Sequence, residues 1–84
     1  MAKRIKKQIS ERAKKQIANL GKRIKGLREK ADYTNYEKFA NDKNIGRSQY
    51  GKYEQGADMH FSSIMKIIES HDMTVKEFFS KGFE

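Results

Sequence analysis

Apolar residues recur at intervals of three or four over the first third of the chain. The series from Ile5 to Ala31 advances by 4, 4, 4, 3, 4, 3 and 4 positions, which is the spacing of one face of an α-helix. The first ten residues are mainly Lys, Arg and Gln, so we expect this end to fray. Ser10 followed by Glu11 has the residue types of a helix start, and the pattern predicts a stable helix over about Glu11 to Lys30.

Two short helices joined by a tight turn are predicted next. Thr34 and Glu37 have the spacing of a capping box, which would open a helix over about Asn35 to Asp42. The pair Lys43-Asn44 would close it, because Asn tolerates the left-handed backbone conformation of a tight exit. The next helix is predicted over Arg47 to Gln55, where a glycine follows.

Helical spacing returns in the last third of the chain. The apolar residues that predict a fourth helix, ending near Ser70 to Asp72, are Phe61, Ile64, Met65, Ile67 and Ile68. Thr74 and Glu77 form a second capping box, which leads a fifth, short helix. Because the chain has no Pro and few consecutive β-branched residues, it is predicted to be all-α.

Length and composition narrow the functional classes. The 84 residues suffice for one domain with a small core. The absence of Cys excludes a disulfide framework and a thiolate metal site. The N-terminal residues lack the apolar run of a signal peptide or membrane span, so we expect a cytoplasmic protein. Without a phosphate-binding loop, metal-ligand spacing or catalytic triad in sequence, we expect no enzyme, no cofactor and no metal.

Positive charge is concentrated at the N-terminal end. Residues 1–30 carry twelve basic and two acidic residues, a net +10, whereas residues 31–84 carry seven and nine, a net −2. This asymmetry favours a polyanionic partner, nucleic acid or an anionic membrane, although a solvated basic surface is the alternative. Residues 1–12 are predicted to form a basic N-terminal arm or frayed helix ahead of a domain over residues 13–84.

The order of these elements resembles the Cro and phage-repressor type of helix-turn-helix domain, the XRE-like family. The motifs that carry the resemblance are Ile24-Lys25-Gly26-Leu27-Arg28, Phe39-Ala40, Asn44-Ile45-Gly46, Tyr53-Glu54-Gln55-Gly56, Ile64-Met65-Lys66-Ile67-Ile68 and Val75-x-x-Phe78-Phe79. Residues 33–39, 46–51 and 77–79 resemble a subgroup common in Bacteroidetes-type bacteria. The resemblance implies a compact five-helix, lambda-repressor-like domain with a basic N-terminal helix extension.

The resemblance also implies contacts with double-stranded DNA. In this family the helix near residues 47–55 enters the major groove with its N-terminal residues at the base edges. Arg47 can pair bidentately with guanine and Gln49 with adenine, whereas Ser48 can serve a base or a phosphate. Lys52 would reach a base edge or the backbone. An ordinary solvated helix face is the alternative interpretation of these four residues.

The preceding helix would supply contacts to the DNA backbone. The resemblance places Asn35 and Tyr36 at the start of that helix and among its contacts, with Lys38 adding backbone affinity. The Tyr36 hydroxyl could reach a phosphate, or its ring could pack on Phe39 instead.

Three further expectations concern structure rather than DNA. Arg28 and Glu54 are expected to form a partly buried ion pair, because a carboxylate facing DNA would be repelled. Tyr50 and Tyr53, three residues apart, are expected in the core. His71 is expected to be half exposed, without a metal or catalytic role.

Two functional classes therefore compete. The first is a bacterial, sequence-specific DNA-binding transcriptional regulator, associated with the nucleoid and acting as a homodimer. The second is an antitoxin-like or adaptor module that binds a protein partner with the same fold. Phe78, Phe79 and Phe83 favour the second, because exposed aromatic residues this close together suggest an interface, although they would serve a homodimer equally. A third hypothesis, that the basic helix binds a membrane surface, has less support, because the apolar stripe of that helix lacks Trp and Phe.

Overall fold

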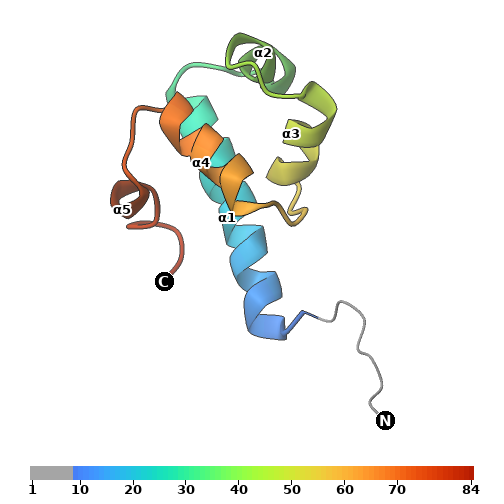
Figure 1. Cartoon of the computed structure of the whole chain (residues 1–84), viewed down its shortest axis with the longest axis vertical. Helices are drawn as coiled ribbons and strands as arrows, with labels where there is room; N and C mark the ends of the chain where they lie inside the picture. The colour runs from blue at the N-terminus through green and yellow to red at the C-terminus, as the bar shows by residue number, and fades with distance from the viewer. Residues whose placement is uncertain (1–8) are drawn as a thin grey trace.

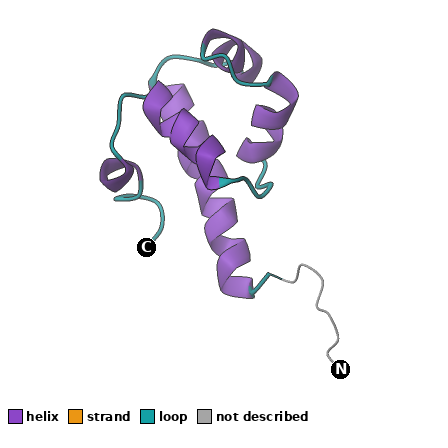
Figure 2. Cartoon of the chain, viewed as in Figure 1, coloured by secondary structure: helices purple, strands orange, loops and turns teal. Residues whose placement is uncertain are grey.

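Five α-helices carry the regular structure of residues 9–84, the part of the chain that the structure, a computed structural model, describes (Figure 1). Their bounds are α1 Glu11–Lys30, α2 Tyr36–Asp42, α3 Arg47–Glu54, α4 Phe61–Ser70 and α5 Val75–Phe78. No strand occurs within residues 9–84 (Figure 2). The prediction of an all-α chain with five helices is confirmed.

Most helix ends follow from local chemistry. The Ser10 hydroxyl accepts a hydrogen bond from the Ala13 N–H at 3.0 Å, so the predicted N-cap of α1 is confirmed. The second capping box is also present: the Thr74 hydroxyl accepts the Glu77 N–H at 3.1 Å, and the Glu77 carboxylate accepts the Thr74 N–H at 2.9 Å. These short-range bonds satisfy helix N–H groups that have no partner within the helix.

The capping box predicted at Thr34 and Glu37 is wrong. Asn35 is the N-cap of α2, and its side-chain oxygen accepts the N–H groups of Glu37 at 2.7 Å and Lys38 at 3.1 Å. With the cap one residue later, Glu37 is the second helical residue and lacks the spacing that a capping box requires.

The predicted basic arm over residues 1–12 lies mostly outside the described residues. Residues 1–8 of that arm are not described, and Glu11 and Arg12 form the first turn of α1. The proposed division after residue 12 therefore falls within a helix.

α1 is the long central helix of the arrangement. α2 and α3 pack on each other, and α3 also packs on α1. α5 packs on α4 and lies on the other side of α1 from α3 (Figure 1). The N-terminal turns of α1 extend beyond the other helices (Figure 1).

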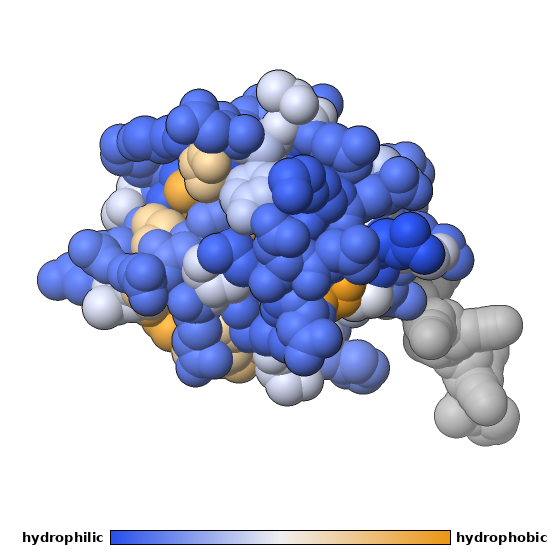
Figure 3. Space-filling view, turned by 90° about the horizontal axis from the view of Figure 1, so that it is seen from above, coloured by the Kyte–Doolittle hydropathy of each residue, from blue (hydrophilic) through white to orange (hydrophobic). Residues whose placement is uncertain are grey.

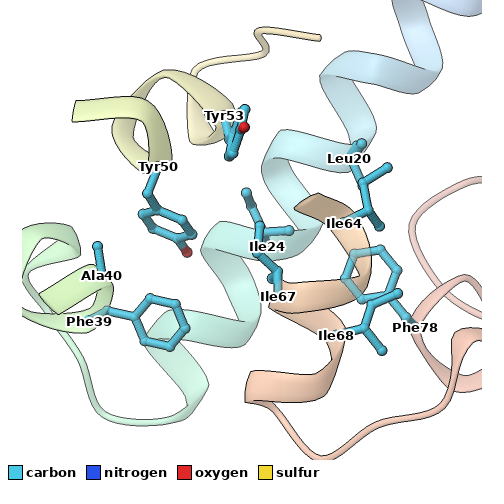
Figure 4. Close-up of a cluster of buried hydrophobic side chains, with 10 residues drawn as sticks. All are labelled: Leu20, Ile24, Phe39, Ala40, Tyr50, Tyr53, Ile64, Ile67, Ile68 and Phe78. Atoms are coloured by element: carbon cyan, nitrogen blue, oxygen red, sulfur yellow. The ribbon is translucent and has the colours of Figure 1, made fainter. Parts of the chain in front are cut away.

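The core takes side chains from all five helices (Figure 4). Its buried members are Leu20, Ile24, Phe39, Ala40, Tyr50, Tyr53, Ile64, Ile67, Ile68 and Phe78. The Phe39 ring lies 5.2 Å from the ring of Tyr50 and 5.2 Å edge-on from that of Tyr33, measured between centroids. The core placement predicted for both tyrosines of α3 is confirmed.

The expectation that Phe78 is exposed is wrong. Its exposed fraction is 0%, whereas that of Phe79 is 37%. The Arg23 guanidinium carbon lies 5.5 Å from the centre of the Phe78 ring, and Arg23 Nε donates to the Phe78 carbonyl at 2.8 Å. Arg23 therefore ties the end of α5 to α1.

Gly21 sets the distance between α1 and α3. A β-carbon at Gly21 would lie 2.7 Å from the Tyr53 carbonyl oxygen and 2.9 Å from that of Glu54, so the two backbones touch at this point. Gly26, by contrast, has nothing within 4 Å of such a β-carbon.

We expect Gly21→Ala to destabilise the fold by about 1 to 3 kcal/mol, because α1 must move away from α3. Gly26→Ala is the matched control and should stabilise by up to about 1 kcal/mol, because alanine favours a helix interior. Urea unfolding followed by circular dichroism measures both. Equal stability of the two variants would contradict the contact between the helices.

Candidate nucleic-acid interface

A short turn fixes α3 relative to α2. Asn44 adopts a φ of 60°, as its predicted role in the exit from α2 requires, and the Ile45 N–H donates to the Ala40 carbonyl at 2.8 Å. Gly46 then serves as the N-cap of α3. The turn therefore occupies only Lys43 to Gly46 and leaves the two helices in contact.

α3 is held through one set of residues and exposes the others. Tyr50, Gly51 and Tyr53 are buried. The four α3 side chains predicted to contact DNA are exposed, and they make no hydrogen bond or ion pair with other residues of the described range 9–84; they are Arg47, Ser48, Gln49 and Lys52. Their donors and acceptors are free to bind another molecule.

The first turn of α3 has open backbone donors. No side chain caps this helix, although Gly46 does accept the Tyr50 N–H through its carbonyl at 2.9 Å. Backbone N–H groups at a helix N-terminus attract anions through hydrogen bonding and the helix dipole. The same turn carries the exposed side chains of Arg47 and Gln49, so cationic, amide and backbone donors lie together.

Tyr36 packs on α3 rather than on Phe39. A β-carbon at Gly51 would lie 2.7 Å from Tyr36 Cε1, so the absence of a side chain at Gly51 admits the tyrosine ring. Gly51 therefore allows α2 and α3 to approach closely. The exposed fraction of Tyr36 is still 36%, which leaves it accessible at the junction of the two helices.

The other two α2 candidates have partners within the chain. Asn35 uses its side-chain oxygen as the N-cap described above. Lys38 Nζ lies 3.7 Å from Asp42 Oδ2 in an exposed i,i+4 pair. Such surface pairs are weak, so Lys38 can exchange its partner for a phosphate at small cost.

Sequence reasoning missed Lys66 of α4. This exposed residue lines a hollow of about 180 Å³ together with Gly46 and Gln49 of the α3 start. No sequence signal could have placed it there, because it belongs to a different helix and only the packing brings them together. The surface seen from the α2 end is mostly hydrophilic (Figure 3).

The expected ion pair between α1 and α3 is present. Arg28 Nε donates to Glu54 Oε2 at 2.7 Å and Nη2 donates to Oε1 at 2.9 Å, with side-chain exposed fractions of 6% and 8%. Arg28 Nη1 also donates to the Tyr33 carbonyl at 2.7 Å. These hydrogen bonds to the Glu54 carboxylate raise the pKa of Arg28. One guanidinium therefore fixes α3 and the loop before α2 to α1.

His71 stacks on the core and is half buried. Its ring lies 5.2 Å from the Phe39 ring at an interplanar angle of 15°, and its buried Nε2 has no hydrogen-bond partner within residues 9–84. Burial lowers the pKa of His71, and the cations Lys43 and Arg23 lower it further, while Asp72 acts in the opposite direction. The folded protein therefore favours the neutral form of the His71 ring.

We expect the free energy of unfolding to fall as the pH drops through about 6.5. The unfolded histidine binds a proton near its ordinary pKa of about 6.5, whereas the folded one binds it only at lower pH, so protonation favours unfolding until the folded form is protonated too. His71→Leu should reduce this fall in the free energy of unfolding. Urea unfolding of both proteins between pH 8 and pH 5 measures it, and parallel curves would contradict the depressed pKa.

Within residues 9–84, no group of three or more His, Cys, Asp or Glu side chains could hold a metal ion. None of the helices in that range combines the length and apolar character needed to cross a bilayer.

Comparisons with known proteins return no match: no protein-family model, no curated protein and no solved structure resembles the chain closely enough to count.

Proposed function

We propose that this protein is a sequence-specific, DNA-binding transcriptional regulator of the helix-turn-helix type that reads the major groove with α3. The observation that carries the proposal is the state of α3. It is anchored by Tyr50, Gly51 and Tyr53, while the four polar side chains of its outer face are exposed and unpartnered within residues 9–84; they are Arg47, Ser48, Gln49 and Lys52. A solvated face alone does not require the rigid anchoring that the ion pair and the Gly21 contact supply.

The chemistry of the exposed residues supports base recognition. Arg47 offers a planar fork of donors that matches the O6 and N7 atoms of guanine, and the Gln49 amide matches N6 and N7 of adenine. The open N-terminus of α3 favours a phosphate beside these side chains. Asn35, Tyr36 and Lys38, at the start of the neighbouring α2, would bind the DNA backbone and fix the orientation of α3.

The proposed active form is a homodimer on a pseudopalindromic site. One helix reads only a few base pairs, so affinity and specificity require a second copy about 34 Å away, one helical turn along the duplex. Such a regulator would act in the bacterial cytoplasm, at the nucleoid, without catalysing a reaction.

Selection from random double-stranded DNA tests the proposal. The full chain should enrich a short motif with two related half-sites. Arg47→Ala/Gln49→Ala should lose this enrichment, and Lys76→Ala on α5 should keep it. If the parent enriches no sequence, the proposed function is wrong.

Lys52→Ala should weaken binding to all sequences about equally. A phosphate contact carries no base information, so its loss should lower the slope of log affinity against log salt by about one unit. Lys76→Ala provides the matched control, because it removes the same charge from α5, across the bundle from α3 (Figure 1). Fluorescence anisotropy at several salt concentrations measures both variants, and an identical slope for Lys52→Ala would exclude the contact.

The second candidate function, an antitoxin-like or adaptor protein, is supported by a different observation. Phe79 is partly exposed beside Phe83, with ring centroids 5.0 Å apart, at the C-terminal end of the chain. Failure of the DNA selection together with binding of a protein at these residues would favour this function.

A further inference from the structure

An apolar groove of about 420 Å³ lies between α1, the segment before α4 and the C-terminal end of the chain. Ile17 and Leu20 of α1 line it together with Met59, Phe79 and Phe83. Gln16 closes one edge by donating to the Phe83 carbonyl at 3.5 Å. Almost all of its wall is apolar, in contrast to the hydrophilic surface at the α2 end (Figure 3).

The apolar stripe continues from the groove along the projecting turns of α1. Ile17 is half buried, Ala13 lies one turn earlier, and Ile9 beyond the helix start is 40% exposed. No other helix of the described chain covers these turns (Figure 1). The groove and the stripe together form an elongated apolar surface of the kind that marks a binding site.

Cations flank this surface on both sides. Residues three or four apart are neighbours on a helix, so Arg12 lies beside Gln16 and Lys14 lies beside Ile17. Both cations are exposed, and Lys14 makes only a 3.6 Å surface pair with Glu11. Asp58 is the one acid that lines the groove. The surroundings of the groove are therefore net positive on the α1 side.

We infer that this groove binds an amphipathic helix of a partner protein, with an apolar stripe flanked by Asp and Glu. Leu-type side chains of that helix would enter the groove over Leu20, Met59 and Phe79, and its acids would pair with Arg12 and Lys14. Methionine and aromatic walls adapt well to such side chains. This inference goes beyond the proposed DNA binding and does not depend on it.

Charge and shape disfavour three other occupants of the groove, namely a second copy of this chain, an anionic membrane and nucleic acid. A second copy that laid its own α1 in the groove would bring its basic turns against Arg12 and Lys14, and like charges repel. An anionic bilayer would complement the charge, but a membrane-binding surface must insert into the lipid, and this surface is hollowed. Duplex DNA presents its phosphates outward, so it would gain little from an apolar wall.

A display library of helical peptides provides the test. All members carry Leu at positions i, i+4, i+7 and i+11, and the flanking positions vary among Glu, Lys and Gln. Selection on the full chain without DNA should enrich Glu at the flanks. The enriched peptide should bind Ile17→Ser/Phe79→Ser at least tenfold more weakly, and in an NMR titration it should shift the amide signals of the groove residues.

A charge-reversed variant keeps the test independent of folding. Arg12→Glu/Lys14→Glu changes only exposed side chains and should weaken the enriched peptide about threefold to tenfold, while a peptide with Lys at the flanks should gain affinity. No enrichment, enrichment of Lys, or shifts elsewhere would overturn the inference. So would binding of phosphatidylserine vesicles in place of peptide, or a dimer in sedimentation equilibrium that Phe79→Ser disrupts. DNA selection is unaffected by each of these outcomes, so the two proposals fail separately.

Discussion

Glu54→Gln and Arg28→Met should each lower the free energy of unfolding by about 3 to 5 kcal/mol. Both side chains are almost fully buried, so either substitution leaves the remaining charge without its counter-ion in a site that water barely reaches. Arg28→Met also removes the donor to the Tyr33 carbonyl, so it should have the larger effect. Urea unfolding at pH 7 measures both variants.

Two controls separate burial from charge. Lys38→Met breaks the exposed pair with Asp42 and should cost less than about 1 kcal/mol. The double variant Arg28→Met/Glu54→Leu should cost less than the sum of the single changes, because no unpaired charge remains. Parent-like stability of Glu54→Gln would show that the pair lies at the surface, and the orientation of α3 on α1 would then be wrong.

Arg47→Ala/Gln49→Ala should produce the largest loss of DNA affinity. Each bidentate base contact contributes about 1 to 3 kcal/mol, so two independent contacts contribute about 2 to 6 kcal/mol. This corresponds to a loss of about 30-fold to about 20,000-fold on the selected site. Both residues are exposed, so the stability of the fold should not change.

The affinity of this variant for the selected site is compared with its affinity for non-specific DNA. Affinity for a random duplex should fall far less, because it rests mainly on phosphate contacts that these variants leave in place. Equal losses on the selected site and on the random duplex would mean that the two side chains supply backbone affinity only.

Local patterns were enough to predict the helices. The bounds of α1 follow from its apolar spacing and from the hydroxyl of Ser10, and α5 follows from the reciprocal Thr74 and Glu77 bonds. At α2 two residues of capping type are adjacent, and sequence spacing favoured Thr34 where the folded chain uses Asn35. The choice between adjacent caps depends on the path of the preceding loop, which Arg28 holds through the Tyr33 carbonyl.

Contacts between helices were harder to predict. The Arg28 and Glu54 pair could be expected, because a buried carboxylate on α3 needs a cation. The backbone contact at Gly21 and the hollow beside Lys66 join residues far apart in sequence, so no local pattern indicates them. Phe78 and Phe79 are chemically identical neighbours, and only the packing of α5 on α4 decides which of them is buried.

The most direct measurement is base discrimination by single variants on the selected site. Binding of the parent, Arg47→Ala, Gln49→Ala and Lys52→Ala is measured on the site and on each of its single-base variants, at two salt concentrations. We predict that Arg47→Ala and Gln49→Ala each lose discrimination at one base pair per half-site, while Lys52→Ala keeps the full base preference and lowers the salt slope by about one unit. Full base preference in both Arg47→Ala and Gln49→Ala would contradict the proposal that α3 reads DNA.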